Sequence, residues 1–237
     1  MSAVGPTTTA APRLALFDLD GTLLTGDTDV LWCDFLIEEG VLERSAFQAA
    51  NAVIAERYAR GAITPAEFCA FYASTLAGRS REDWLALRTR FVETKVLPRI
   101  GGAARALVAR HRQAGDRVLL TTATNRFLTE PIATDLQIAE PDLIATELEQ
   151  ADGVFTGTHT GVLNMREGKV ERLSAWLSAR NLPASAIAES TFYSDSANDL
   201  PLLRVVGRAV AVDPDLRLRE EAGRRGWPIL ALAGSPS

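Results

Sequence analysis

The chain has 237 residues, of which 47% are hydrophobic and 23% are charged, and its formal net charge at pH 7 is −5. This length fits one large domain or a core with a smaller insertion, and the composition is typical of a soluble globular protein. The negative charge and the lack of a Lys/Arg run argue against nucleic acid as a partner, and no apolar run approaches the roughly 20 residues needed to cross a bilayer.

The first 12 residues are small and polar, and they are rich in Thr and Ala. They lack the basic start and the apolar stretch of a signal peptide. We therefore predict a flexible N-terminal tail at 1–12 and a cytoplasmic protein that does not bind a membrane.

Two aspartates directly follow the first predicted strand, which covers the apolar residues 14–16. Asp18 and Asp20 are separated by one residue, so in extended chain both carboxylates lie on the same side and can face one ligand. Gly21 then allows a turn, and Thr22 adds a hydroxyl. One such acid can act as a nucleophile while the other moves protons, and the pair can hold a hard cation. The alternative is a solvated Asp-Gly turn.

The segment 26–97 interrupts the α/β pattern and is predicted to be entirely helical. Helix start signals occur at Asp27, at Thr64, where Pro and then Glu follow, and at Ser80. The predicted organisation is a tail at 1–12, an α/β core formed by 13–25 and 98–237, and a helical cap at 26–97.

After residue 102, predicted strands and helices alternate again. Strands are predicted at 118–121, 143–146, 191–193, 209–212 and 228–231, helices at 103–113, from near 125, at 170–180 and at 197–204, and a hairpin at 147–160. Strands separated by helices imply an α/β fold in which both faces of a doubly wound parallel sheet are covered.

Further polar residues lie at or near the ends of the later strands and the starts of the helices. Thr122 ends one strand, and Asp195 follows another, with Asn198 and Asp199 shortly after it. Lys169 precedes a predicted helix. Each has a structural alternative: Thr122 and Asp195 are also suited to cap helices, and Lys169 to lie solvated at a helix start.

Four motifs occur in this order along the chain: Asp18 to Thr22, Thr122, Lys169, and Tyr193 to Asp199. Together they resemble the four motifs of the haloacid dehalogenase superfamily, in its phosphoserine-phosphatase-like branch, and the resemblance covers residues 13–232. The resemblance implies a Rossmannoid sheet with a helical cap and a Mg²⁺-dependent phosphatase that acts on a small phosphate monoester through an aspartyl-phosphate. The resemblance implies that Asp18 is the nucleophile and a metal ligand, that Asp20 is the general acid and base and a metal ligand through its backbone carbonyl, and that Asp195 is the third metal ligand. It implies that Thr122 and Ala123 bind the phosphate and that Lys169 neutralises charge at the phosphoryl group. It also implies that Asn198 and Asp199 support Asp195, Lys169 or metal-bound water.

The chain departs from phosphoserine phosphatases at the substrate site. Asp27 lies near the place of their ammonium-binding acid, but the stretch 61–78, where their arginine should lie, contains no Lys or Arg. A substrate carboxylate buried without such a partner would cost several kcal/mol, although Arg60 or Arg79 could substitute.

The motif neighbourhoods are more similar to a bacterial subgroup that is often assigned as histidinol-phosphate phosphatases. That substrate carries an ammonium and an imidazole but no carboxylate, which suits an acidic and aromatic opening at Asp27, Asp29 and Trp32. We therefore expect histidinol phosphate as the substrate, with Asp27 and Trp32 as binding residues.

Several alternatives remain. The first is a phosphoserine phosphatase, and the second is a phosphomutase or phosphotransferase of the same superfamily. A signalling receiver domain would use a similar acidic pocket, but at about half this length and without Asp20 or the insertion. The sequence does not determine the oligomeric state.

Overall fold

The computed structural model describes residues 13–60 and 62–232, so the predicted tail at 1–12 lies outside the described residues. The strands are β1 (Leu14–Phe17), β2 (Arg117–Asn125), β3 (Leu143–Ala151), β4 (Val154–Thr160), β5 (Thr191–Ser194), β6 (Arg208–Val212) and β7 (Ile229–Leu230). The α-helices are α1 (Thr28–Glu38), α2 (Arg44–Ala59), α3 (Pro65–Ala73), α4 (Arg81–Phe91), α5 (Gly102–Gln113), α6 (Arg126–Asp135), α7 (Glu167–Ser178), α8 (Leu200–Leu203) and α9 (Leu216–Arg225). Among these described helices, none has the length and apolar character needed to span a membrane.

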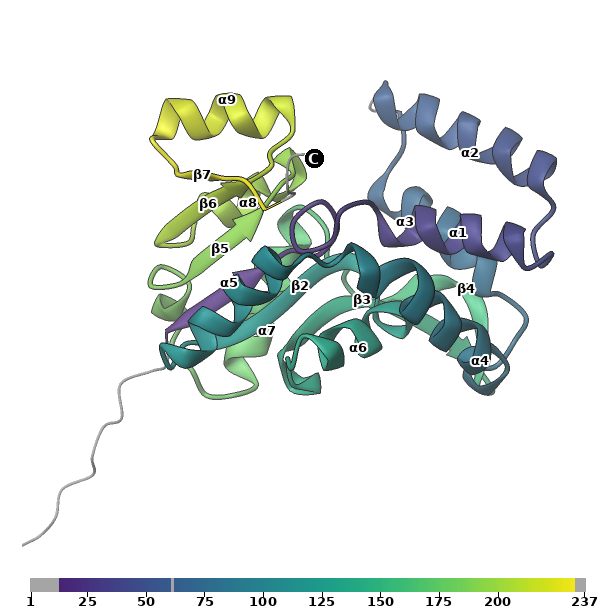
Figure 1. The fold of residues 1–237 in the computed structure, drawn as a ribbon, viewed down its shortest axis with the longest axis horizontal. Helices are drawn as coiled ribbons and strands as arrows, with labels where there is room; N and C mark the ends of the chain where they lie inside the picture. Colours follow the sequence, from purple (N-terminus) through teal and green to yellow (C-terminus); the bar gives the residue numbers. More distant parts are fainter. Residues whose placement is uncertain (1–12, 61, 233–237) are drawn as a thin grey trace, which may run out of the picture.

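The strands of the described residues form one sheet in the order β4-β3-β2-β1-β5-β6-β7 (Figure 1). Every pairing is parallel except that of β3 with β4. Because β1 lies between β2 and β5, the chain first builds one side of the sheet and later the other. Open α/β sheets bind ligands outside the carboxyl ends of their strands at such a point. The predicted doubly wound sheet is confirmed.

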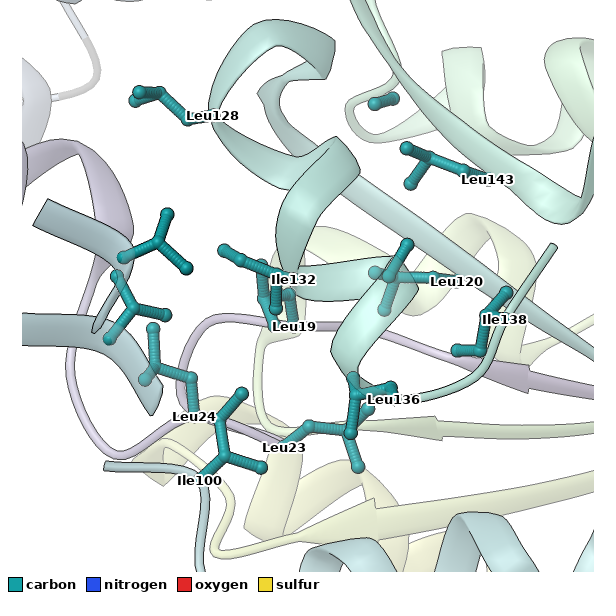
Figure 2. Close-up of a cluster of buried hydrophobic side chains, with 14 of the residues drawn as sticks. Leu19, Leu23, Leu24, Ile100, Leu120, Leu128, Ile132, Leu136, Ile138 and Leu143 are labelled. Carbon is teal, nitrogen blue, oxygen red and sulfur yellow. The ribbon is translucent and has the colours of Figure 1, made fainter. Parts of the chain in front are cut away.

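Both faces of the sheet are apolar, because alternate residues of each strand point to opposite faces. Ala15 and Phe17 of β1 pack in one core with residues of α5 and α6, whereas Leu14 and Leu16 pack in a second core with residues of α7, α8 and α9. Figure 2 shows part of the first core, including Ile132 of α6. Helices therefore cover both faces and leave the strand ends open to a ligand.

Every element described between β1 and α5 is a helix or a helical turn, as predicted for this insertion. Helices α1 to α4 gather at one end of the molecule (Figure 1). Asp27, Thr64 and Ser80 cap α1, α3 and α4, and the last two form complete capping boxes. The Thr25 backbone N–H donates to the Arg99 carbonyl at 3.1 Å, which joins the two chain segments that connect the insertion to the sheet.

The sequence signals missed two helices, α2 and α9, and misplaced two boundaries. Before α2, the carboxylate of Glu43 accepts hydrogen bonds from backbone N–H groups of the helix start at 3.0 and 2.7 Å, and glutamate is not a usual N-cap residue. Strand β2 continues to Asn125, because its last residues stay extended beside β3 with a shift in register. The segment predicted as a helix at 197–204 is a 3₁₀ turn followed by the short α8.

The predicted hairpin is formed by β3 and β4. Its two turn residues, Asp152 and Gly153, have φ angles of 51° and 79°. Positive φ at both central positions is what a two-residue turn of type I′ requires, and Asp-Gly is a favoured pair there.

Candidate active site

Asp18 follows β1 and forms an ion pair with a buried lysine. Lys169 Nζ, in the first turn of α7, donates to Asp18 Oδ1 at 2.8 Å and to Asp199 Oδ2 at 2.7 Å. Only 3% of the Lys169 side chain is exposed, so it is not a solvated helix-start lysine. Burial alone would lower the pKa of Lys169, but the carboxylates of Asp18 and Asp199 outweigh that effect and raise it. A fixed positive charge therefore lies beside Asp18.

Local packing holds Lys169 and Asp199 in position. A Cβ atom on Gly168 would lie 1.9 Å from the carbonyl oxygen of Leu163, so this close approach at the start of α7 requires glycine. The Ser194 hydroxyl donates to Asp199 Oδ2 at 2.7 Å. Asp199 therefore accepts hydrogen bonds from both Lys169 and Ser194, and this second bond helps to fix the carboxylate that holds the lysine.

Asp20 lies two residues from Asp18 but has different partners. Its Oδ1 accepts from the backbone N–H of Thr28 at 2.7 Å and from the Thr28 hydroxyl, and its Oδ2 accepts from the Thr124 hydroxyl at 2.7 Å. Burial, and after it the charge of Asp27, raise the pKa of Asp20 to about 7 despite these hydrogen bonds. Burial also raises the pKa of Asp18 to about 6, against the attraction of Lys169.

The two carboxyl groups therefore differ in what stabilises them. The Lys169 ammonium group favours the ionised form of Asp18, whereas Asp20 is held by hydroxyl and backbone N–H donors and its pKa is raised to about 7. Pairs of carboxyl groups whose environments separate their pKa values commonly divide the nucleophile and acid–base roles.

Asp195 follows β5 and contacts the turn after Asp20. The Thr22 hydroxyl donates to Asp195 Oδ1 at 3.1 Å and accepts from the Asp195 backbone N–H at 3.0 Å. Gly21 has a φ of +72°, and a Cβ atom there would lie 2.1 Å from Asp195 Oδ2. Burial, followed by the negative charge of Asp18, raises the pKa of Asp195 to about 8. The carboxylates of Asp18 and Asp195 thus lie close enough for their charges to repel each other.

Neither Asp195 nor Thr122 acts as a helix cap. Ser196, not Asp195, caps the turn after β5, and Asn125, not Thr122, caps α6. The structural alternatives for these two residues are therefore wrong.

Thr122 is held where β2 changes register. Its side chain is fully buried, whereas Ala123 is exposed at the site. Asn164, which the sequence analysis did not identify, donates from Nδ2 to Thr121 Oγ1 at 3.0 Å and to the carbonyls of Thr122 and Ile144 at 2.9 and 2.7 Å. This amide ties the segment before α7 to the ends of β2 and β3.

A cavity of about 520 Å³ connects these groups with α1, α2 and α3. Its acidic lining residues are Asp18, Asp20, Asp27, Asp29, Asp195 and Asp199. Its uncharged lining residues include Val30, Asn51, Ile54, Phe68, Tyr72, Thr122, Ala123, Thr124, Met165, Ser196 and Asn198. Among the described residues that line it, Lys169 is the only cation. The cavity therefore favours ligands that bring positive charge to its acidic side.

A family model for haloacid dehalogenase-like hydrolases matches residues 15–204. The chain belongs to this family. A histidinol-phosphatase from Neisseria meningitidis serogroup C (strain 8013) is 38% identical over 219 residues, which cover 92% of this chain and 98% of that protein. Phosphoserine phosphatase SerB1 from Mycobacterium tuberculosis (strain ATCC 25618 / H37Rv) is 33% identical over 224 residues, covering 91% and 69%.

A crystal structure of a protein with unknown function from Bordetella pertussis Tohama I has a TM-score of 0.87 and 41% identity, and covers 93% of this chain and 99% of that one. The family match and the phosphatases among the relatives identify this haloacid dehalogenase-like protein as a phosphoric monoester hydrolase. Its predicted family and enzyme class are confirmed.

The residues expected to hold a metal ion in this hydrolase fit a magnesium ion. The described residues contain no group of three or more His, Cys, Asp or Glu side chains placed to share one ion. The expected set uses only two side chains, Asp18 and Asp195, plus the Asp20 backbone carbonyl. All three donor atoms are oxygens, which Mg²⁺ prefers. The negative charge of Asp18 also raises the pKa of Asp195, and a cation bound by both carboxylates would relieve this repulsion.

The expectation that Trp32 contacts the substrate is wrong. Trp32 is 1% exposed, its Nε1 donates to Thr75 Oγ1 at 3.2 Å, and its ring packs on Phe35, Trp84 and Phe91. It does not line the cavity. The aromatic residues that do line it, Phe68 and Tyr72, come from α3 and carry no distinguishing sequence signal.

Proposed function

We propose that this phosphatase hydrolyses its substrate through an aspartyl-phosphate on Asp18, with Mg²⁺ as cofactor. The observation that carries the proposal is the pairing of Asp18, whose carboxylate accepts from Lys169 at 2.8 Å, with a neighbouring Asp20 that is held by Thr28 and Thr124 and whose pKa is raised to about 7. Both line one cavity with Thr122 and Asp195.

In the first step, an Asp18 carboxylate oxygen attacks phosphorus, and the bond from phosphorus to the leaving oxygen breaks. Asp20 gives its proton to that oxygen, so the alcohol leaves neutral. Lys169 stabilises the charge that develops on the phosphoryl oxygens and on Asp18. The hydroxyl of Thr122 and the backbone at Ala123 bind the phosphoryl group.

In the second step, water attacks phosphorus and the bond to Asp18 breaks. Asp20, now ionised, takes the proton of that water, and inorganic phosphate leaves. One residue can serve first as acid and then as base because its pKa lies near the working pH.

Asp18, Asp195 and the backbone carbonyl of Asp20 would hold Mg²⁺, with Asn198 and Asp199 supporting the surrounding residues. The ion supplies charge neutralisation, without which an anionic nucleophile and a phosphate dianion repel each other. Lys169 alone cannot balance the acidic residues that line the cavity.

We further propose that helices α1 to α4, within 26–97, act as a cap over the core formed by 13–25 and 98–237. The cavity is lined by Asp27 and Tyr72 from this insertion as well as by Asp18 and Lys169 from the core. Residues of both parts also share one hydrophobic core, which includes Phe91. The cap would exclude water and contact the leaving group.

Histidinol phosphate is the substrate that the cavity supports best. Its leaving group carries nitrogen cations and no carboxylate, and among the described lining residues only Lys169, already paired with two aspartates, is basic. A phosphoserine carboxylate would meet Asp27 and Asp29 without a basic partner. Phosphoserine remains the second candidate because of the SerB1 relative.

The test is phosphate release from a panel of monoesters that includes histidinol phosphate and phosphoserine, with Mg²⁺ present. We expect the highest kcat/KM on histidinol phosphate and free phosphate as the product. Preference for phosphoserine would overturn the substrate assignment, and an isomerised sugar phosphate without free phosphate would identify a phosphomutase.

A further inference from the structure

Asp29 is the second residue of α1 and lies where two cavities meet. The first is the cavity of about 520 Å³ described above, and the second is a small extension of about 30 Å³. Both are lined by Asp29, Phe68, Tyr72, Ala123 and Met165. The extension has room for about two waters, which the end of a leaving group could displace.

Asp29 differs from the other aspartates of the cavity in its lack of donors. Asp27 Oδ1 accepts from the Val30 backbone N–H at 2.9 Å, which caps α1, and both oxygens of Asp20 accept hydrogen bonds. Lys169 donates to Asp18 and Asp199, and Thr22 donates to Asp195. Among the groups that the structure describes, none donates a hydrogen bond to the Asp29 carboxylate.

The surroundings of Asp29 make a cationic ligand favourable. Burial, and after it the negative charges of Asp27 and Asp20, raise its pKa well above the usual range. A cationic N–H donor would supply both the missing hydrogen bond and the missing charge, and charge-assisted hydrogen bonds are the stronger class. The rings of Phe68 and Tyr72, which line both cavities together with Asp29, suit a planar or cationic group.

We propose that Asp29 is the specificity-determining residue of this phosphatase and accepts a hydrogen bond from a cationic nitrogen of the leaving group. A leaving group that carries a carboxylate supplies no such cation, and the ionised form of Asp29 would repel it. This inference rests on the proposed function. It assigns recognition of the cationic leaving group to Asp29, because Asp27 already accepts a hydrogen bond as the cap of α1.

The test compares the wild type with Asp29→Asn, Asp27→Asn and Asp34→Asn. Asp34 is an exposed aspartate on the same helix that does not line the cavity, so it controls for loss of charge from α1. The substrates are histidinol phosphate, its analogue without the amino group, and p-nitrophenyl phosphate. We expect Asp29→Asn to lower the ratio of kcat/KM for histidinol phosphate to that for p-nitrophenyl phosphate at least tenfold, mainly through KM.

Asp34→Asn should leave the ratio at the wild-type value, and Asp27→Asn should lower it less than Asp29→Asn. A ratio for Asp29→Asn within twofold of the wild type would overturn the inference while leaving the phosphatase assignment intact. A larger loss on the analogue without the amino group than on p-nitrophenyl phosphate would show that the imidazole is the group read by Asp29.

A second measurement does not need turnover. Calorimetry gives the dissociation constant of histidinol phosphate for Asp18→Asn and for Asp18→Asn combined with Asp29→Asn. At least tenfold weaker binding to the double variant supports the inference even if the proposed reaction fails in the kinetic test. Equal binding contradicts it.

Discussion

Replacing Lys169 by Met removes the only cation among the described residues that line the cavity. The side chain is 3% exposed and bonds to Asp18 and Asp199 at 2.8 and 2.7 Å, so methionine fills a similar volume but leaves two buried carboxylates without a counter-charge. Removing one partner of a buried ion pair costs about 3–5 kcal/mol where the remaining charge cannot be neutralised.

Two effects on activity follow. Loss of a preorganised positive group beside the reacting oxygens lowers kcat by about 10²–10³-fold. In addition, the pKa of Asp18 is about 6 only because Lys169 opposes the effect of burial, so it rises further in the variant. Asp18 must be ionised to attack, and the acidic limb of the pH–rate profile should therefore move to higher pH.

The assay is p-nitrophenyl phosphate hydrolysis with Mg²⁺ over roughly pH 5 to 9, a range that brackets the pKa values of Asp18 and Asp20. Lys95→Met is the matched control, because Lys95 is the only other lysine of the sequence and pairs with Glu38 away from the cavity. Both variants need a thermal unfolding curve to confirm folding. A folded Lys169→Met enzyme with kcat within threefold of the wild type and an unmoved acidic limb would refute the assigned role.

Further outcomes follow from the same site. Asp18→Asn should lower kcat by at least about 10³-fold while the thermal unfolding curve stays close to that of the wild type, and near-normal turnover would contradict its role as nucleophile. EDTA should abolish activity and Mg²⁺ restore it, whereas Ca²⁺ should support poor turnover because of its larger and looser coordination shell; full activity in chelator would exclude the metal. In metal-free protein, the folded state holds the Asp195 proton up to about pH 8, compared with 3.8 for the unfolded chain, so the free energy of unfolding should fall as pH rises between these values. Urea unfolding in EDTA should show that fall, and Asp195→Asn should make it smaller; an equal fall in both proteins would mean that Asp195 is not its source.

The sequence was sufficient for the parts of the site that come from short motifs at strand ends. Asp18, Asp20, Thr122 and Asp195 each lie at or just after a strand of one parallel sheet, so the order of the motifs along the chain brings them to one edge. Lys169 could be placed only through the family resemblance, because nothing in its local sequence indicates that it is buried.

The cap side of the cavity was less predictable, because it depends on the rotation of helices. Trp32 lies four residues after the buried Thr28 and faces the core with Phe35 and Leu36, whereas Asp29 lies on another side of α1 and faces the cavity. The segment is apolar on most sides, so its sequence does not reveal which side is buried.

Residues from α2 and α3 reach the cavity only through tertiary packing. Asn51 and Ile54 lie on α2, for which no start signal was evident, and Asn164 lies in an irregular segment. Their roles depend on contacts that are far apart in sequence, such as those of Asn164 with β2 and β3.

The most direct test of the central claim is chemical trapping of the phosphoryl group on Asp18. Enzyme mixed with excess substrate and Mg²⁺ is quenched in acid and treated with borohydride, which reduces an aspartyl-phosphate to homoserine, and the peptides are then sequenced by mass spectrometry. We predict homoserine at position 18, absent without substrate and absent in Asp18→Asn. Homoserine at another aspartate would contradict covalent catalysis by Asp18. So would its absence at every position in wild-type enzyme that was releasing phosphate at full rate when it was quenched.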